Sequence, residues 1–262
     1  MPGLDANRLA AALKHEPFVR RIVVHRTTGS TNDDARRLAA DGAPEGTVVL
    51  AEHQTEGRGR LGRSWESPAQ VGLYLSLLLR PTEPPEGIGR YPIAAAVAVC
   101  SACRAFAGES AVLKWPNDVL AHKAKLAGVL CELRHSPSGA DLVLGIGVNV
   151  NQTAQDFDAS LRETATSLRM LCAGVTVDRE AFAAALLRAL GATIATLREG
   201  AWTEVAKQFL RYAPHATGWR VRLAAGGEGI TDGLDVTGAL RVATANGIVL
   251  VHASESVALV EE

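Results

Sequence analysis

A run of three arginines separated by glycines limits most strongly how this chain can fold. Residues 52–65 read EHQTEGRGRLGRSW, with Arg58, Arg60 and Arg63 close together. A packed core does not accept several guanidinium groups in one short stretch, so the sequence predicts a surface loop. Glycine lets backbone N–H groups approach a ligand closely, and a guanidinium donates a planar fork of hydrogen bonds that matches carboxylate or phosphate oxygens. We therefore expect a loop that binds an anion.

The alternative interpretation of this loop is a solvated turn or an RGG-like nucleic-acid-binding tail. Such tails repeat, whereas here the unit occurs once, with Glu52, Glu56 and Glu66 nearby. The net charge of -1 also leaves no overall field that would attract nucleic acid or an anionic membrane. Any anion binding must therefore be local.

The composition is that of a globular protein with one large domain and a small second one. The chain has 262 residues, of which 47% are apolar and 21% charged. Its first residues lack a signal-peptide pattern, and we find no apolar run approaching the roughly 18 residues of a membrane span. We therefore expect a cytoplasmic protein.

Two of the four cysteines, Cys100 and Cys103, have the spacing of a redox or zinc pair. They lie in the apolar run AAAVAVCSACRAF, and no second Cys or His pair has ligand spacing. We predict buried core thiols.

The hydrophobic pattern predicts a mixture of helices and strands. Strands at 46–51 and 72–80 flank the arginine loop, which is then held at both ends and free in the middle, as suits a lid. We expect further strands at 22–24, 111–114, 119–121, 125–133 and 141–150, and helices at 5–13, 31–41, 88–106, 178–198 and 201–212. From His215 onward, short alternating runs broken by glycines predict a small β-barrel of about five strands, with a domain boundary near 213–216.

Several polar residues have two open interpretations. Ser30 or Thr31 could cap a helix, or its hydroxyl could face a cleft and bind a ligand. Lys125 begins a returning strand seven residues after Asp118, so a hairpin could bring its ammonium group to that carboxylate, although an edge-strand lysine is also common. Asn149 follows a buried strand, where binding sites tend to gather.

The order and spacing of five motifs resemble biotin protein ligase. These are STN at 30–32, the arginine loop, KWPND at 114–118, KLAG at 125–128 and GIGVNVN at 145–151. The resemblance implies an α+β fold in which residues 1–213 form a mixed-sheet catalytic domain of the biotin/lipoate ligase type and residues 214–262 form an SH3-like β-barrel. The form without a DNA-binding domain is expected, because the residues before position 25 are too few for a winged helix-turn-helix, which needs about 60.

The resemblance also implies an enzyme with a two-step reaction. ATP would activate biotin as biotinyl-5'-AMP, and the biotinyl group would then pass to a specific lysine of a biotin carboxyl carrier protein of the acetyl-CoA carboxylase type. ATP and biotin are the expected substrates and Mg²⁺ the expected cofactor. Neither nucleic acid nor membrane is an expected partner, and we expect a monomer or a homodimer.

Roles for individual residues follow from the resemblance. Lys125 and Arg60 would be catalytic, and Asp118 would bind Mg²⁺. Biotin would contact Ser30, Thr31, Asn32, Gln54, Arg58, Gly59, Arg60, Lys125 and Gly128. ATP would contact Arg63, Trp65, Lys114, Asn117, Asp118 and Asn149.

Two residues in the loop have less certain roles. Trp65 could stack on adenine, cover the loop or belong to the core. Glu56 departs from the family pattern, in which a small residue is usual, and it could form an ion pair with Arg58.

Three other functions remain as alternatives. A lipoate ligase or octanoyl transferase shares the fold and a related lysine, although the arginine loop and KWPND argue against it. A binding protein that responds to biotin or a nucleotide without catalysis is the second. A nucleic-acid-binding module, disfavoured by the balanced charge, is the third.

Overall fold

A seven-stranded mixed sheet forms the centre of the protein, as the computed structural model shows for residues 3–136 and 139–260. The strand order is β1-β2-β3-β7-β6-β5-β4, with β1 and β2 parallel and the other neighbours antiparallel. The strands are β1 (Arg21–His25), β2 (Thr47–Ala51), β3 (Leu73–Leu79), β4 (Ala111–Lys114), β5 (Asp118–Ala121), β6 (Ala124–Ser136) and β7 (Gly139–Val148). The predicted strands are all present, and β6 is longer than its apolar pattern indicated.

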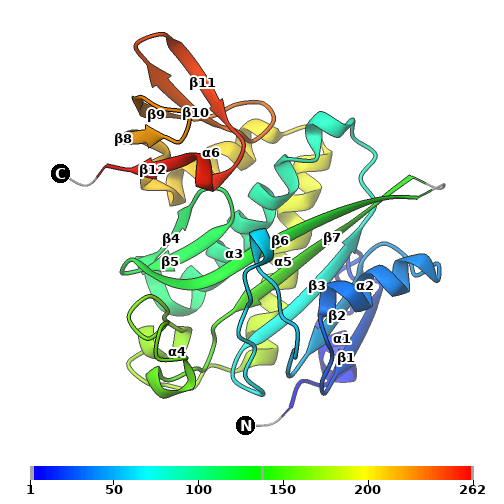
Figure 1. Ribbon diagram of the computed structural model, residues 1–262. Coiled ribbons are helices and arrows are strands. Elements are labelled where there is room, and N and C mark those ends of the chain that lie inside the picture. The colour runs from blue at the N-terminus through cyan, green and yellow to red at the C-terminus, as the bar shows by residue number, and fades with distance from the viewer. Residues whose placement is uncertain (1–2, 137–138, 261–262) are drawn as a thin grey trace.

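Helices cover the two faces of this sheet unequally (Figure 1). One face packs against a large apolar cluster to which α3, α5 and α6 contribute, whereas a much smaller cluster joins the other face to α2. The helices are α1 (Ala6–Ala12), α2 (Thr31–Ala40), α3 (Arg90–Ala107), α4 (Leu168–Leu171), α5 (Arg179–Arg198) and α6 (Trp202–Tyr212). The thinly covered face is therefore available for a site.

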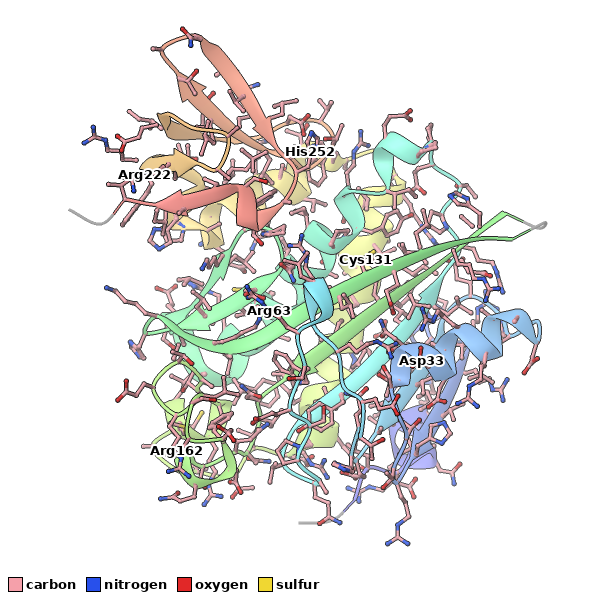
Figure 2. The ribbon with its side chains drawn as sticks, viewed as in Figure 1. Asp33, Arg63, Cys131, Arg162, Arg222 and His252 are labelled. Carbon is pink, nitrogen blue, oxygen red and sulfur yellow. The ribbon has the colours of Figure 1, made fainter. Side chains whose placement is uncertain are left out.

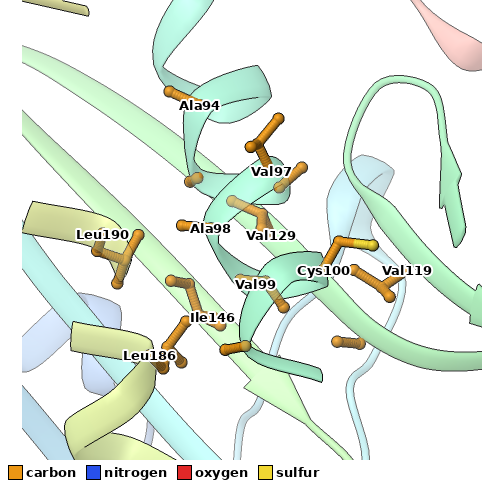
Figure 3. Close-up of a cluster of buried hydrophobic side chains, with 14 of the residues drawn as sticks. Ala94, Val97, Ala98, Val99, Cys100, Val119, Val129, Ile146, Leu186 and Leu190 are labelled. Atoms are coloured by element: carbon orange, nitrogen blue, oxygen red, sulfur yellow. The ribbon is translucent and has the colours of Figure 1, made fainter. Parts of the chain in front are cut away.

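Strand periodicity explains why the two faces differ. Alternate residues of a strand point to opposite faces, so Leu75 and Leu77 of β3 join the large cluster, while Leu78 joins the small one. Figure 3 shows the packed side, where α3 and α5 meet Val129 and Ile146 of the sheet. Of the residues next to these two in their strands, three are glycines, so the opposite, α2 side of the sheet carries few side chains here.

Two of the core helices are more apolar than we expected. The stretches 85–110 and 179–198 are long and apolar enough to cross a membrane by length and composition, so our statement that no run approaches that length was wrong. Half or more of each stretch is buried inside the fold. Helices of this kind are common in the cores of globular proteins, because neighbours cover them on most sides.

The cysteines predicted to be core thiols are buried and free. Burial raises the pKa of the Cys100 thiol to about 12, and it raises the pKa of the Cys103 thiol as well. Neither residue is suited to redox or metal chemistry at neutral pH.

The carboxy-terminal strands form a second, five-stranded sheet of order β11-β10-β9-β8-β12. They are β8 (Thr217–Leu223), β9 (Glu228–Leu234), β10 (Leu240–Thr244), β11 (Gly247–Val251) and β12 (Val257–Leu259). Within the described part of the chain, β11 and β12 are edges that do not pair with each other, so the sheet is open and the predicted small β-barrel is not confirmed. Short alternating strands have the same sequence pattern in both architectures, which is why the sequence did not separate them.

This second sheet is fastened to the main body by two tryptophans. Trp115 Nε1 donates to Gly238 O at 3.1 Å, and Trp202 Nε1 donates to Asp235 O at 3.2 Å. Buried residues of β8 and β10 also belong to the large apolar cluster. The second sheet is thus held beside the end of the central sheet that carries β4 and β5 (Figure 1).

Candidate functional site

The arginine-rich loop is a long hairpin that crosses the thinly covered face of the sheet (Figure 1). Its arms are joined by backbone hydrogen bonds, from Gln70 N to Glu52 O at 3.2 Å near the base to Gly59 N to Arg63 O at 2.7 Å near the tip. The tip is a single 3-10 turn, Arg60–Gly62. We predicted a loop free in its middle, but the two arms support each other because its glycines let the backbones pair closely.

Two arginines attach this hairpin to other parts of the protein. Arg60 Nη1, at the tip, donates to Asn117 Oδ1 at 3.2 Å and to Ser254 Oγ at 3.4 Å. Arg58 donates two hydrogen bonds to the Asp33 carboxylate of α2. The Glu56 ion pair that we considered is not formed among the described residues, because Arg58 pairs with Asp33 and Glu56 acts on Arg58 only at longer range.

The first residues of α2 bind the hairpin through hydroxyl and amide groups. Thr31 donates to Gln54 Oε1 from its backbone N at 2.9 Å and from its Oγ1 at 3.0 Å. Ser76 Oγ lies 2.7 Å from Thr31 Oγ1. Ser30 begins the helix, but its side chain makes no capping hydrogen bond. Capping therefore explains neither hydroxyl, and that of Thr31 is instead engaged by Gln54 and Ser76.

The Asn32 side chain is held at both ends of its carboxamide. Its Oδ1 lies 2.5 Å from Ser76 Oγ, and its Nδ2 donates to Glu132 Oε2 at 2.6 Å. A Cβ atom at Gly145 would lie 2.2 Å from Asn32 Oδ1, so only glycine leaves room for this amide. Asn32, predicted to bind a ligand, thus also shapes one wall of the site.

A second pair of glycines makes room for Trp65. Gly128 and Gly147 are direct cross-strand partners on β6 and β7, and the indole of Trp65 lies over them. A Cβ at Gly147 would come within 2.5 Å of Trp65 Cε2. Trp65 is not a core residue, since it belongs to the hairpin and covers the sheet. Among the described residues, its buried Nε1 has no hydrogen-bond partner, an arrangement that is costly unless another molecule accepts the bond.

Lys125 lies at the centre of this surface. Its Nζ is 2.8 Å from Asp118 Oδ1 and 5.5 Å from the centroid of the Trp65 ring. The strand order places β6 between β5 and β7, so Lys125 is not an edge-strand lysine. The predicted meeting of ammonium and carboxylate is confirmed. Asn149 Nδ2 donates to Lys125 O at 3.3 Å and so helps to fix the lysine backbone.

The other end of the surface lies under the carboxy-terminal sheet and carries two cationic side chains and a histidine. Lys114 ends β4, and His215 and Arg222 come from the carboxy-terminal segment. The His215 ring packs edge-on against Trp219 with centroids 4.1 Å apart, and its buried Nδ1 has no hydrogen-bond partner in the part of the chain that the structure describes. Burial lowers the pKa of His215, and the charge of Lys114 lowers it further.

These residues enclose one continuous cavity of about 1090 Å³. This volume is at the upper end of the roughly 300–1,000 Å³ usual for small-molecule sites, so two ligands fit side by side. Figure 2 shows Arg63 at the hairpin, between Asp33 near α2 and Arg222 on the carboxy-terminal sheet. Every residue predicted from the sequence lines the cavity: Ser30, Thr31, Asn32, Gln54, Arg58, Gly59, Arg60, Arg63, Trp65, Lys114, Asn117, Asp118, Lys125, Gly128 and Asn149.

Sequence reasoning missed several lining residues. Gly145 and Gly147 could have been found, because two glycines at i and i+2 of a strand leave one face without side chains. His215 and Arg222 carried no local signal, since only the packing of the second sheet brings them to the cavity.

A magnesium ion fits this site only together with a phosphate-bearing ligand. Among the described residues, no three His, Cys, Asp or Glu side chains gather as a metal site. Magnesium commonly binds through one or two carboxylates, substrate phosphates and water. Asp118 lines the cavity and can supply one such carboxylate.

Comparison with known proteins places the chain in a family. Residues 24–149 match the model of the biotin/lipoate A/B protein ligase family. The chain is 38% identical over 248 residues to the biotin--[acetyl-CoA-carboxylase] ligase of Mycobacterium tuberculosis, an alignment that covers 92% of this chain and 90% of that protein. The chain belongs to the biotin protein ligase family.

Other members of the biotin protein ligase family extend the match. The bifunctional ligase/repressor BirA of Bacillus subtilis is 39% identical over 180 residues, which cover 68% of this chain and 55% of that protein, so the chain spans about half the length of this relative. The structure of biotin protein ligase from Aquifex aeolicus in complex with biotin and ATP superposes with a TM-score of 0.77 and 29% identity, covering 93% of this chain and 100% of that one. The mixed α+β architecture of the chain is thus the fold of the biotin protein ligases.

Proposed function

We propose that this protein activates biotin with ATP to form biotinyl-5'-AMP and then transfers the biotinyl group to a lysine of a biotin carboxyl carrier domain. In the first step a carboxylate oxygen of biotin attacks the α-phosphorus, and the bond to the β-phosphate oxygen breaks to release pyrophosphate. In the second, the carrier amine attacks the acyl carbon, and AMP leaves. Relatives named as ligases of this type, and a family structure that holds biotin and ATP, support the proposal.

The single observation that carries the proposal is the position of Lys125 within the cavity. Towards α2 lie uncharged hydrogen-bonding groups such as Ser30 and Gln54, suited to the polar ring of biotin. Towards the carboxy-terminal sheet lie the cations Lys114 and Arg222, suited to a triphosphate. The ammonium group between these two ends is where a carboxylate and an α-phosphate would meet.

Electrostatics defines the task of this centre. Two anions must be held together against their repulsion, and fixed cationic donors can stabilise the charge that develops on the phosphoryl oxygens. We assign this role to Lys125 and Arg60, with Arg63 and Lys114 on the phosphate side. We propose that Asp118, which orients Lys125 through their 2.8 Å contact, also contributes a ligand to Mg²⁺. A bound Mg²⁺ would add neutralising charge on the phosphates.

The remaining assignments are proposals as well. We propose residues 1–213 as the catalytic domain and residues 214–262 as a smaller domain that closes the nucleotide end of the cavity. An acetyl-CoA carboxylase carrier is the proposed acceptor, by analogy with the ligases of Mycobacterium tuberculosis and Paracoccus denitrificans. The proposed location is the cytoplasm.

The test is to mix the purified protein with MgATP and biotin, lipoate or octanoate in the presence of a carrier domain. Of the three acids, we expect only biotin to cause pyrophosphate release, together with a mass increase on the carrier lysine. Release with lipoate or octanoate instead would leave the assignment of the fold intact and refute biotin as the substrate. No release with any of the three would favour a binding protein without catalysis.

A further inference from the structure

The upper part of the hairpin is attached to α2 by an ion pair, while its base is held by the buried pair of Glu52 with Arg179. Arg58 Nη1 lies 2.8 Å from Asp33 Oδ2, and Arg58 Nη2 lies 2.7 Å from Asp33 Oδ1. This paired geometry is the strongest kind of hydrogen bond between a guanidinium and a carboxylate. The hydrogen bonds from Arg58 lower the pKa of Asp33 to about 2, and Arg36 of the same helix also contacts this carboxylate.

The pairing of the hairpin arms transmits this attachment to Trp65. Arg58 is bridged to Ser64 across the hairpin, and Trp65 N donates to Gly57 O at 2.9 Å. Holding Arg58 at α2 therefore holds the opposite arm, and with it the indole over Gly147. The contacts of the hairpin tip are weaker by comparison, since the two hydrogen bonds of Arg60 are 3.2 Å and 3.4 Å long.

Arg58 was predicted to bind a ligand directly, but this contact turns its donors towards the protein. From sequence, Asp33 was expected only to be an acidic residue in the first turn of a helix. Asp33 and Arg58 are each about one-third exposed, so the pair lies at the rim of the cavity, where it can open without unfolding the core.

We infer that Asp33 is a positioning residue that holds the arginine hairpin closed over the cavity through Arg58, and thereby slows the escape and hydrolysis of the activated intermediate. The kinetic half of this inference, that closure slows the escape and hydrolysis of the intermediate, rests on the proposed function. The geometric half, that Asp33 holds the hairpin closed, does not. If the hairpin opens, water can attack the acyl carbon, break its bond to the phosphate oxygen and release biotin and AMP without transfer.

The geometric half is tested by limited trypsin digestion of the full chain without added ligand, with cleavage after Arg58, Arg60 and Arg63 followed by mass spectrometry. Asp33→Asn should speed this cleavage by about fivefold, as expected for a part-exposed ion pair. Asp33→Glu keeps the carboxylate and should restore part of the protection. The control is Asp41→Asn, at the other end of α2, and trypsin should cleave this variant at the same rate as the parent protein. An unchanged cleavage rate in Asp33→Asn, with a circular dichroism spectrum like that of the control, would overturn the inference.

A second comparison distinguishes an effect on the hairpin from an effect on α2 alone. Arg36→Ala removes the other partner of Asp33 but leaves the Arg58 contact intact. If Asp33 acts only on the helix, Arg36→Ala and Asp33→Asn should increase cleavage equally, and that result would refute the inference. We expect a clear increase only in Asp33→Asn.

The kinetic half is tested by following pyrophosphate and AMP with biotin and MgATP but no carrier. Asp33→Asn should leave the initial burst of pyrophosphate unchanged and raise the slow release of AMP after the burst by about fivefold. An unchanged slow phase would refute a role in retention. If even the parent protein forms no pyrophosphate, the proposed function fails, and the digestion result still decides whether Asp33 holds the hairpin.

Discussion

At the α2 end of the cavity, a series of hydrogen bonds connects five side chains: Gln54, Thr31, Ser76, Asn32 and Glu132. Among the described residues, the cationic groups under the carboxy-terminal sheet have few such contacts with one another. There, His215 Nδ1 is buried and has no hydrogen-bond partner within residues 3–136 and 139–260. The first end is rigid before any ligand arrives, and the second can adjust its long side chains. A rigid end suits a ligand of fixed shape, while flexible cations suit a polyphosphate, whose charge matters more than its outline.

The largest effect is expected for Lys125→Ala, which removes the group between the two ends. Because the role that we propose for this cation is to stabilise the transition state, we expect pyrophosphate formation to slow by about 10²–10³-fold. The measurement is single-turnover pyrophosphate release at saturating biotin and MgATP. Thermal stability should stay close to that of the parent protein, since Lys125 is partly exposed. A decrease of the pyrophosphate-formation rate smaller than tenfold would refute a catalytic role for Lys125.

The rigid end is tested by Gly145→Ala. The new methyl group would lie 2.2 Å from Asn32 Oδ1, so the amide network must shift. Overpacking of this kind typically costs about 1–3 kcal/mol, and we expect the KM for biotin to rise about tenfold or more while the KM for ATP changes little. Gly128→Ala is the graded comparison, because its nearest contacts would be at 3.4 Å and its effect should be smaller. Equal increases in both KM values would contradict the division of the cavity into two ends.

A smaller effect is expected for Glu56→Ala. Glu56 contributes only longer-range attraction to Arg58, so its loss should change the KM for biotin by no more than about fivefold. Steady-state kinetics at low ionic strength gives the clearest test. A thousandfold loss of activity would show that Glu56 has a direct role that its position does not indicate.

The smallest effect concerns His215 at the adjustable end. Burial lowers its pKa in the folded state, so the unfolded chain binds the proton more readily. This histidine therefore supports folding fully above its unfolded pKa of about 6.5, and its contribution falls as the pH decreases through the folded pKa. When the pH is lowered from 7.5 to 5.5, the thermal midpoint should fall less in His215→Gln than in the parent protein, by a difference of about 1 °C or less.

Much of this protein could be predicted from local sequence because the relevant signals are local. Apolar periodicity gave the strands and helices of the main body, and the short distance from Asp118 to Lys125 predicted their contact across a hairpin, at 2.8 Å. Glycine and arginine composition identified the hairpin itself. The paired arms were not predicted, because cross-strand hydrogen bonds depend on a register that loop composition does not encode.

The sequence alone therefore determined most elements of the main body, the family resemblance and many of the polar residues that line the cavity. Only the tertiary structure decided how those residues are used: Asn32 and Asn149 hold their neighbours, and Arg58 turns towards Asp33. It also decided that the carboxy-terminal strands form an open sheet and that His215 reaches the cavity. The physical reason is that composition and periodicity report which face of an element is apolar, while the partner of a polar group depends on contacts between residues far apart in the chain.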